Sequence, residues 1–154
     1  MFGFLKDLVK TDAPVTEVAQ SERTELAKAM IDLLVEAAKT DGGIDDEERH
    51  IIAHIMAEHF ALDEDEMNKL FDEAVIAAQE RVDIHSLTRR LRDLTDYEDR
   101  LAMLELIWMV VLADEHLDHI EASLMRRLAG LLYIEDVDSG KAAKAAKARL
   151  ALAE

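Results

Sequence analysis

The sequence contains no cysteine, a single proline and five glycines among its 154 residues. Without cysteine the chain can form no disulfide, no thiolate metal site and no cysteine nucleophile. Aromatic residues make up only 5% of the chain, which argues against a glycosidase cleft with aromatic platforms. The longest unbroken apolar run, which ends at Ala113, is too short to span a bilayer. These absences exclude disulfide scaffolds and membrane-spanning helices.

Positive charge is also scarce, with 18 Lys and Arg against 34 Asp and Glu, a formal net charge of −16. Such a charge repels phosphate backbones and anionic lipid, so we expect no nucleic-acid partner and no direct membrane insertion. Cations or a basic protein partner suit it better, while the oligomeric state is left open. Hydrophobic residues make up 50% of the chain, which favours one folded domain over disorder. The first residues lack a basic leader, so we expect a cytoplasmic protein.

Apolar residues recur at three- and four-residue steps, which predicts an all-α single domain of about seven to eight helices. A segment covering residues 1–20, with a possible short amphipathic helix before Pro14, precedes a helical domain at 21–154. That segment is either a strap over the core or a docking helix. Asp63 and Glu66 have the spacing of a helix-starting capping box. The expected helices cover residues 22–40, 46–60, 64–81, 84–94, 97–113, 119–133 and 138–152.

The chain aligns with itself when it is shifted by 73 residues. Residues 29–34 (AMIDLL) then fall on residues 102–107 (AMLELI), and acidic residues of two connecting segments also coincide. We therefore predict two repeat units, about 24–81 and 97–152, that pack with pseudo-two-fold symmetry. That symmetry would bring the two connecting segments to comparable positions.

The two connecting segments, residues 41–48 and 114–121, each carry the pattern Asp-x-x-(Ile/Leu)-Asp-x-x-Glu. In both copies the second Asp can cap the following helix, and the Glu three residues later completes a capping box. The first Asp lies at the carboxyl end of a helix, where the helix dipole disfavours negative charge. A bound hard cation such as Ca²⁺ or Mg²⁺ would offset that cost, although solvent or a basic side chain could also do so. The candidate ligands are Asp41, Asp45, Glu48, Asp114, Asp118 and Glu121.

An EF-hand does not explain the first segment. Counted from Asp41, the sixth position holds Asp46, where the EF-hand needs glycine, and the twelfth holds Ile52, where it needs a bidentate glutamate. Metal binding and purely structural, solvated capping loops therefore both stay open.

At these segments the sequence resembles the TerB-like family, bacterial proteins named for tellurite resistance. The resemblance rests on residues 38–48 (AKTDGGIDDEE), residues 111–121 (VLADEHLDHIE) and the helix that begins with residues 97–100 (YEDR). It covers about residues 24–135. The second segment has Glu115-His116 where the family usually shows a glycine after the Asp.

The resemblance implies an all-helical fold of about seven helices with internal pseudo-symmetry. It also implies a divalent-cation site on the six acidic positions, and links to stress response and membrane-associated complexes. From it we expect a non-enzymatic binding module that docks a protein partner, with no catalytic residue and no organic cofactor.

The alternative is a small metal-dependent hydrolase that uses histidines together with acids. His50 and His54 lie one helical turn apart, as Zn²⁺ ligands can, and Glu47 lies nearby. His116 and His119 belong to the second acidic segment. No general-base Glu stands between His50 and His54, so the signal is weak.

Overall fold

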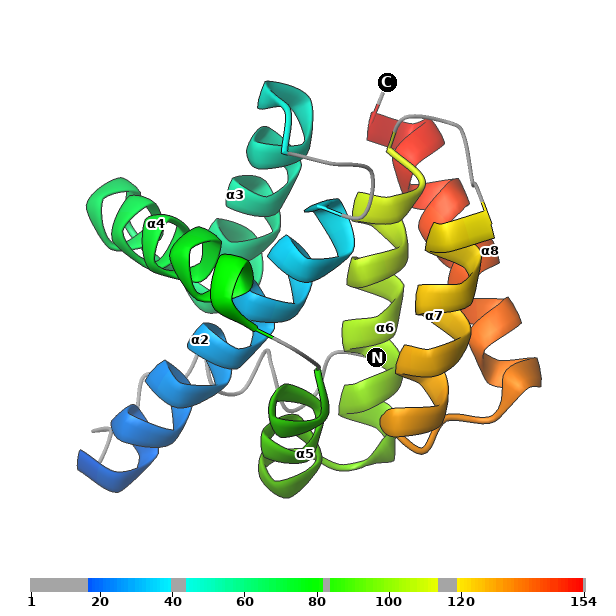
Figure 1. Cartoon of the computed structure of the whole chain (residues 1–154), viewed down its shortest axis with the longest axis horizontal. Coiled ribbons are helices and arrows are strands. Elements are labelled where there is room, and N and C mark those ends of the chain that lie inside the picture. Colours follow the sequence, from blue (N-terminus) through cyan, green and yellow to red (C-terminus); the bar gives the residue numbers. More distant parts are fainter. Residues whose placement is uncertain (1–16, 40–43, 82–83, 114–118, 154) are drawn as a thin grey trace.

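The computed structural model describes residues 17–39, 44–81, 84–113 and 119–153, and all regular secondary structure in those ranges is helical (Figure 1). The expected all-α single domain is confirmed. Of the expected N-terminal segment 1–20, residues 1–16 lie outside the described residues, and residues 17–20 belong to the first helix, which begins five residues before the predicted start at residue 22. The helices are α2 (Glu17–Ala38), α3 (Asp46–Phe60), α4 (Glu64–Glu80), α5 (His85–Leu94), α6 (Tyr97–Val111), α7 (His119–Leu131) and α8 (Asp136–Ala153).

Capping side chains explain where several helices begin. Asp45 and Asp96 each accept a hydrogen bond from the backbone N–H three residues on, and each is part of a complete capping box. Asp63 makes only the first half of a box, accepting from Glu66 N at 2.8 Å. Two helices end without glycine, because Ala61 and Tyr133 adopt left-handed backbone with φ of 53° and 58°. The Tyr133 turn ends α7 two residues before the predicted boundary.

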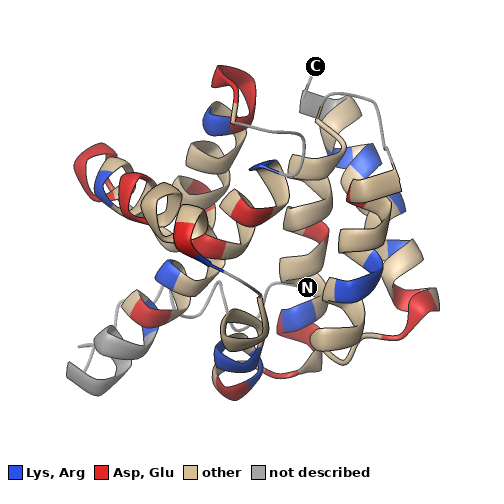
Figure 2. Ribbon diagram, viewed as in Figure 1, with Lys and Arg blue, Asp and Glu red and all other residues tan. Residues whose placement is uncertain are grey.

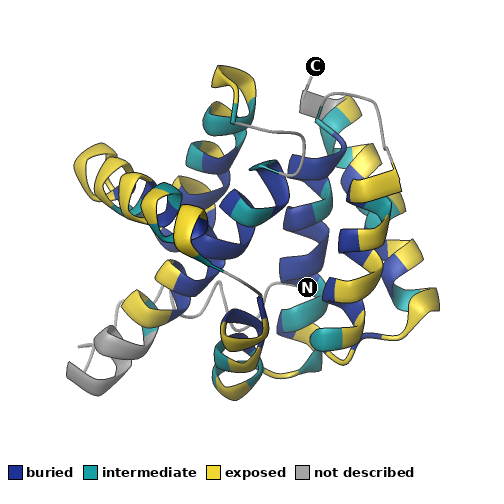
Figure 3. Cartoon of the chain, in the orientation of Figure 1, coloured by how far each residue is buried: buried dark blue, intermediate teal, exposed yellow. Residues whose placement is uncertain are grey.

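The core is built around α2 and α6, which pack against each other. Helices α3, α4 and α5 cover α2, while α7 and α8 cover α6. Figure 3 shows α6 buried along most of its length, and its Met103, Leu104 and Ile107 are fully enclosed. Trp108 is partly buried against this core. No described helix is both long and apolar enough to cross a membrane.

The two halves of the chain use buried acids in a parallel way. Asp32 on α2 and Glu105 on α6 occupy positions 73 residues apart and are both 5% exposed. Arg81, just after α4, lies 3.8 Å from Asp32, and Arg149 on α8 lies 2.7 Å from Glu105. Each buried carboxylate thus meets an arginine from the third helix of its own unit, or from the residue after it. The pseudo-two-fold symmetry itself stays a prediction.

Candidate functional site

The first acidic segment ends in a complete capping box at the start of α3. Asp45 has extended backbone (φ −84°, ψ 174°), and its Oδ1 accepts a hydrogen bond from Glu48 N at 2.7 Å. The N–H of Asp45 donates in return to Glu48 Oε1 at 3.2 Å. Ile44, just before the cap, is partly buried against the core. The predicted capping role of Asp45 and Glu48 is therefore confirmed.

This turn also concentrates exposed negative charge. Asp45, Asp46 and Glu47 are exposed, and Glu48 is half-buried. The helix dipole favours acids in the first turn of a helix, so the arrangement is stable without a ligand. The Asp45 cap occupies Oδ1, and a carboxylate has two oxygens with about four acceptor positions. Capping and ion binding by Asp45 are therefore chemically compatible.

The second acidic segment is described only at its end. Glu121, in the first turn of α7, is 6% exposed, much more buried than Glu48 at the corresponding position of the first segment. Asp41, Asp114 and Asp118 lie outside the described residues. Three of the six predicted ligands can thus be placed: Asp45, Glu48 and Glu121.

The described acids do not form a metal centre by themselves. Within the ranges that the structure describes, no three His, Asp or Glu side chains gather closely enough to hold a metal ion. In the view of Figure 1 the ends of α2 and α6 and the starts of α3 and α7, which flank the two acidic segments, lie toward the same upper edge of the molecule. That the six carboxylates come together in one site stays a prediction.

The histidines do not support a hydrolase. His50, His54 and His119 are exposed, and His54 Nε2 lies 3.3 Å from a Glu58 carboxylate oxygen. Together with Glu47 they belong to no group in the described part that could hold a metal. His116 lies outside the described residues. His59, at the end of α3, is buried, with 8% of its surface exposed.

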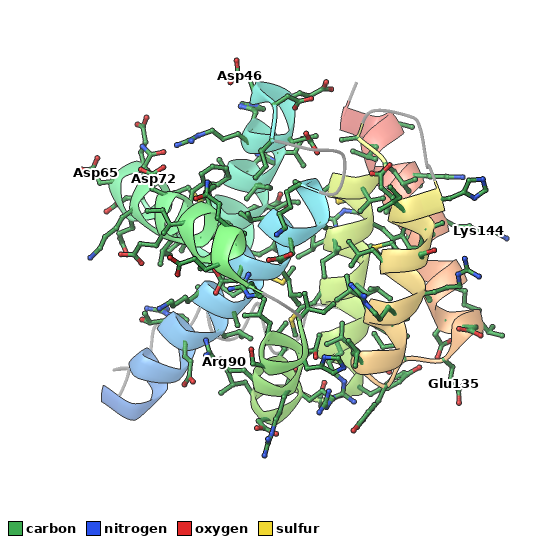
Figure 4. All side chains as sticks on the ribbon, viewed as in Figure 1. Asp46, Asp65, Asp72, Arg90, Glu135 and Lys144 are labelled. Atoms are coloured by element: carbon green, nitrogen blue, oxygen red, sulfur yellow. The ribbon has the colours of Figure 1, made fainter. Side chains whose placement is uncertain are left out.

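Charge is distributed unevenly over the fold (Figure 2). Acids predominate on α3 and α4, whereas α7 and α8 carry exposed bases such as Arg126 and Lys144. In Figure 4 the Asp46, Asp65 and Asp72 side chains project outward from α3 and α4, and Lys144 lies on the opposite side of the molecule. Negative charge is thus concentrated on α3 and α4.

A partly buried ionic network on α2 was not foreseen from the sequence. Arg81 donates to Glu36 Oε1 at 2.7 Å, and Lys39 Nζ lies 3.2 Å from Glu36 Oε2. Lys39 also donates to the Ala78 carbonyl at 2.8 Å, which ties α2 to α4. Burial raises the pKa of Asp32 above its usual value of 3.8, and the nearby Arg81 guanidinium opposes that shift.

Comparison with known proteins places the chain in a family. The family described as "Tellurite resistance protein TerB" matches residues 27–144, about three quarters of the chain. No curated protein and no solved structure matches the chain. The match spans α2 to α8, including the capped start of α3 and the buried Glu121. The chain therefore belongs to the TerB family.

Proposed function

We propose that this TerB-family chain is a non-enzymatic binding module whose two acidic segments bind a divalent cation of the Ca²⁺ or Mg²⁺ type. The observation that carries the proposal is the capped acidic turn at Asp45, whose pattern recurs 73 residues later at Asp118. The capping box fixes the Asp45 and Glu48 carboxylates on rigid backbone at the start of α3. Such pre-positioned oxygens suit a hard cation.

Capping accounts for two acids of each segment but not for the first one. Asp41 follows α2 and Asp114 follows α6, where helix dipoles disfavour negative charge. A bound cation would neutralise both carboxylates and order the two segments. The ordered acidic face beside α3 and α4 would then dock a protein partner.

Calorimetric titration with Ca²⁺, Mg²⁺, Mn²⁺ and Zn²⁺ tests the proposal. We expect saturable binding of an oxygen-preferring ion that is lost in the Asp41→Asn/Asp114→Asn double variant and kept in Asp65→Asn, an exposed acid on α4. Trp108, the single tryptophan, stands six residues before Asp114 and gives a fluorescence signal for the same event.

Two results would count against the proposal. Absence of any ion binding would leave the acids as helix caps and solubilising charge. Tight Zn²⁺ binding that is abolished by His54→Ala would instead favour the hydrolase alternative.

A further inference from the structure

Two helices on opposite sides of the molecule, α4 and α8, carry opposite charge (Figure 1). Helix α4 contains six acids and one lysine, whereas α8 contains four bases and two acids, and both of those acids lie in its first turn. Residues 122–134 and 139–153 contain no acid at all, although Asp and Glu supply 34 of the 154 residues. Figure 2 accordingly shows acids along α4 and bases along α7 and α8. An acidic chain thus has one basic side.

Three lysines dominate the outer face of α8. Lys141, Lys144 and Lys147 are all exposed, and a three-residue spacing keeps them within about 120° around the helix. None of them forms an ion pair or a hydrogen bond with a described residue. The other exposed residues beyond the first turn of α8 are small, such as Gly140 and Ala148. The face therefore offers unpaired positive charge that a second helix can approach closely.

The outer face of α4 presents an apolar side chain among acids. Ile76 is 60% exposed, and its neighbours three or four positions away on the helix are Asp72, Glu73 and Glu80, all exposed. Asp72 lies 3.8 Å from Arg49, whereas Glu73 and Glu80 form no ion pair with a described residue. Two unpaired carboxylates therefore flank Ile76.

The spacing of charge on the two faces is similar. Glu73 and Glu80 lie about 10.5 Å apart along the axis of α4, and Lys141 and Lys147 lie about 9 Å apart along the axis of α8. The flexible lysine side chains can absorb the difference. Two acids can therefore pair with two lysines when the helices lie side by side, and Ile76 then rests on the small residues of α8.

From these features we propose that the chain associates with itself, with α8 of one copy packed against α4 of a second copy. The lysines of α8 pair with the acids that flank Ile76, and Ile76 leaves water. Because α4 and α8 lie on opposite sides of one copy, the two faces can meet only between copies. Such a contact is heterologous, so each copy keeps a free α4 or α8 and further copies can add.

The net charge of −16 opposes association only at long range. At physiological ionic strength, charges more than about 8 Å apart are largely screened from each other. In a head-to-tail contact the two acidic α4 faces are separated by a whole molecule, whereas α4 and α8 meet with opposite charge. Exposed ion pairs are individually weak, so we expect weak association that depends on salt.

Other anionic surfaces fit these observations less well. A membrane or a nucleic acid would also attract the α8 lysines, but either would leave Ile76, on the far side of the molecule, in water. A second copy accounts for both faces at once.

The contact goes beyond the proposed ion site and names one partner for the acidic side of the molecule. Its residues differ from the six candidate ligands, so the two proposals can fail separately. Ion binding by a protein that stays monomeric would overturn the self-association and leave the ion site standing. Self-association without ion binding would do the reverse.

Sedimentation velocity of the full chain tests the proposal at about 0.15 M and about 1 M salt, where the screening length is about 8 Å and about 3 Å. At the lower salt we expect the sedimentation coefficient to rise with protein concentration between the micromolar and millimolar range. At the higher salt the rise should shrink. A monomer under all these conditions would overturn the proposal.

Charge reversal shows whether α4 and α8 form the contact. Glu73→Lys/Glu80→Lys and Lys144→Glu/Lys147→Glu should each abolish association, whereas an equimolar mixture of the two variants should restore it, because opposite charges meet again. The first variant is less negative than wild type, so net charge alone predicts stronger association for it. Stronger association of that variant, or a mixture that stays monomeric, would overturn the assignment.

A matched control keeps the charge change and moves it away from the contact. Lys28→Glu/Arg89→Glu alters exposed residues of α2 and α5 and changes the net charge as much as Lys144→Glu/Lys147→Glu does, yet it should associate like wild type. Ile76→Ser should weaken association about tenfold, because Ile76 no longer gains from burial. Equal losses in the control would contradict the assignment, provided that circular dichroism shows each variant folded.

A membrane would give a different result. Vesicles of phosphatidylserine and phosphatidylcholine that bind a monomeric wild type, and lose it in Lys144→Glu/Lys147→Glu, would assign the basic side to anionic lipid. That outcome would overturn the self-association.

Discussion

Asp45 is the residue at which capping and ion binding can be separated experimentally. Its Oδ1 accepts from Glu48 N at 2.7 Å, and its side chain is exposed at the acidic start of α3. Asp45→Ala removes both the cap and the charge, whereas Asp45→Asn keeps a capping oxygen and removes only the charge. Asn and Asp are about equally good N-caps, so the second substitution should leave the helix intact.

The expected magnitudes follow from these contacts. Loss of the cap in Asp45→Ala should lower the free energy of unfolding by about 1 kcal/mol, which corresponds to about 2–4 °C in Tm for a chain of this size. Asp45→Asn should stay within about 0.5 kcal/mol of wild type. Both should weaken the binding of Ca²⁺ or Mg²⁺ at least about fivefold, because removing one ligand charge costs between about 1 kcal/mol in water and about 4 kcal/mol near a protein surface.

Asp63 provides a matched control, since it caps α4 in the same way and accepts from Glu66 N at 2.8 Å. Asp63→Ala should destabilise the fold by a similar amount in thermal unfolding and leave the calorimetric ion affinity unchanged. Wild-type ion affinity in Asp45→Asn would refute the ligand role of Asp45. Unchanged stability in Asp45→Ala would refute the energetic role assigned to the cap.

Two further predictions concern buried charge. Burial raises the pKa of Asp32, so the native state holds a proton that the unfolded state releases above about pH 3.8. Relative to Asp32→Asn, the free energy of unfolding of wild type should therefore fall as the pH rises from 3.8 to the raised pKa, and then level off. Chemical denaturation at several pH values measures this slope, and the opposite slope would contradict the prediction. Arg149→Ala removes the guanidinium 2.7 Å from the buried Glu105 and should cost about 2 kcal/mol in urea unfolding, while a loss below about 0.5 kcal/mol would mean that the pair is unimportant.

The helices and the first cap could be predicted from the sequence because their causes are local. The bounds predicted for α3, residues 46–60, match the structure, since a capping box and a three-four apolar spacing both act within a few residues. The early end of α7 could not be predicted in the same way. Its turn uses a left-handed Tyr133, a conformation that usually signals glycine.

The buried ionic contacts escaped sequence reasoning because their partners are distant in the chain. Glu36 and Arg81 are 45 residues apart, and Glu105 and Arg149 are 44 residues apart. A charged residue inside an apolar stripe gives no indication of which partner it will meet.

We propose that Asp41 and Asp114 belong to one ion site shared by the two repeat units. Calorimetric titration of wild type and of the two single variants, Asp41→Asn and Asp114→Asn, tests it most directly. A shared site predicts one ion per chain and a weaker affinity for that ion in both variants. Two ions per chain, each lost in only one variant, would contradict the shared site, as would the absence of ion binding in wild type.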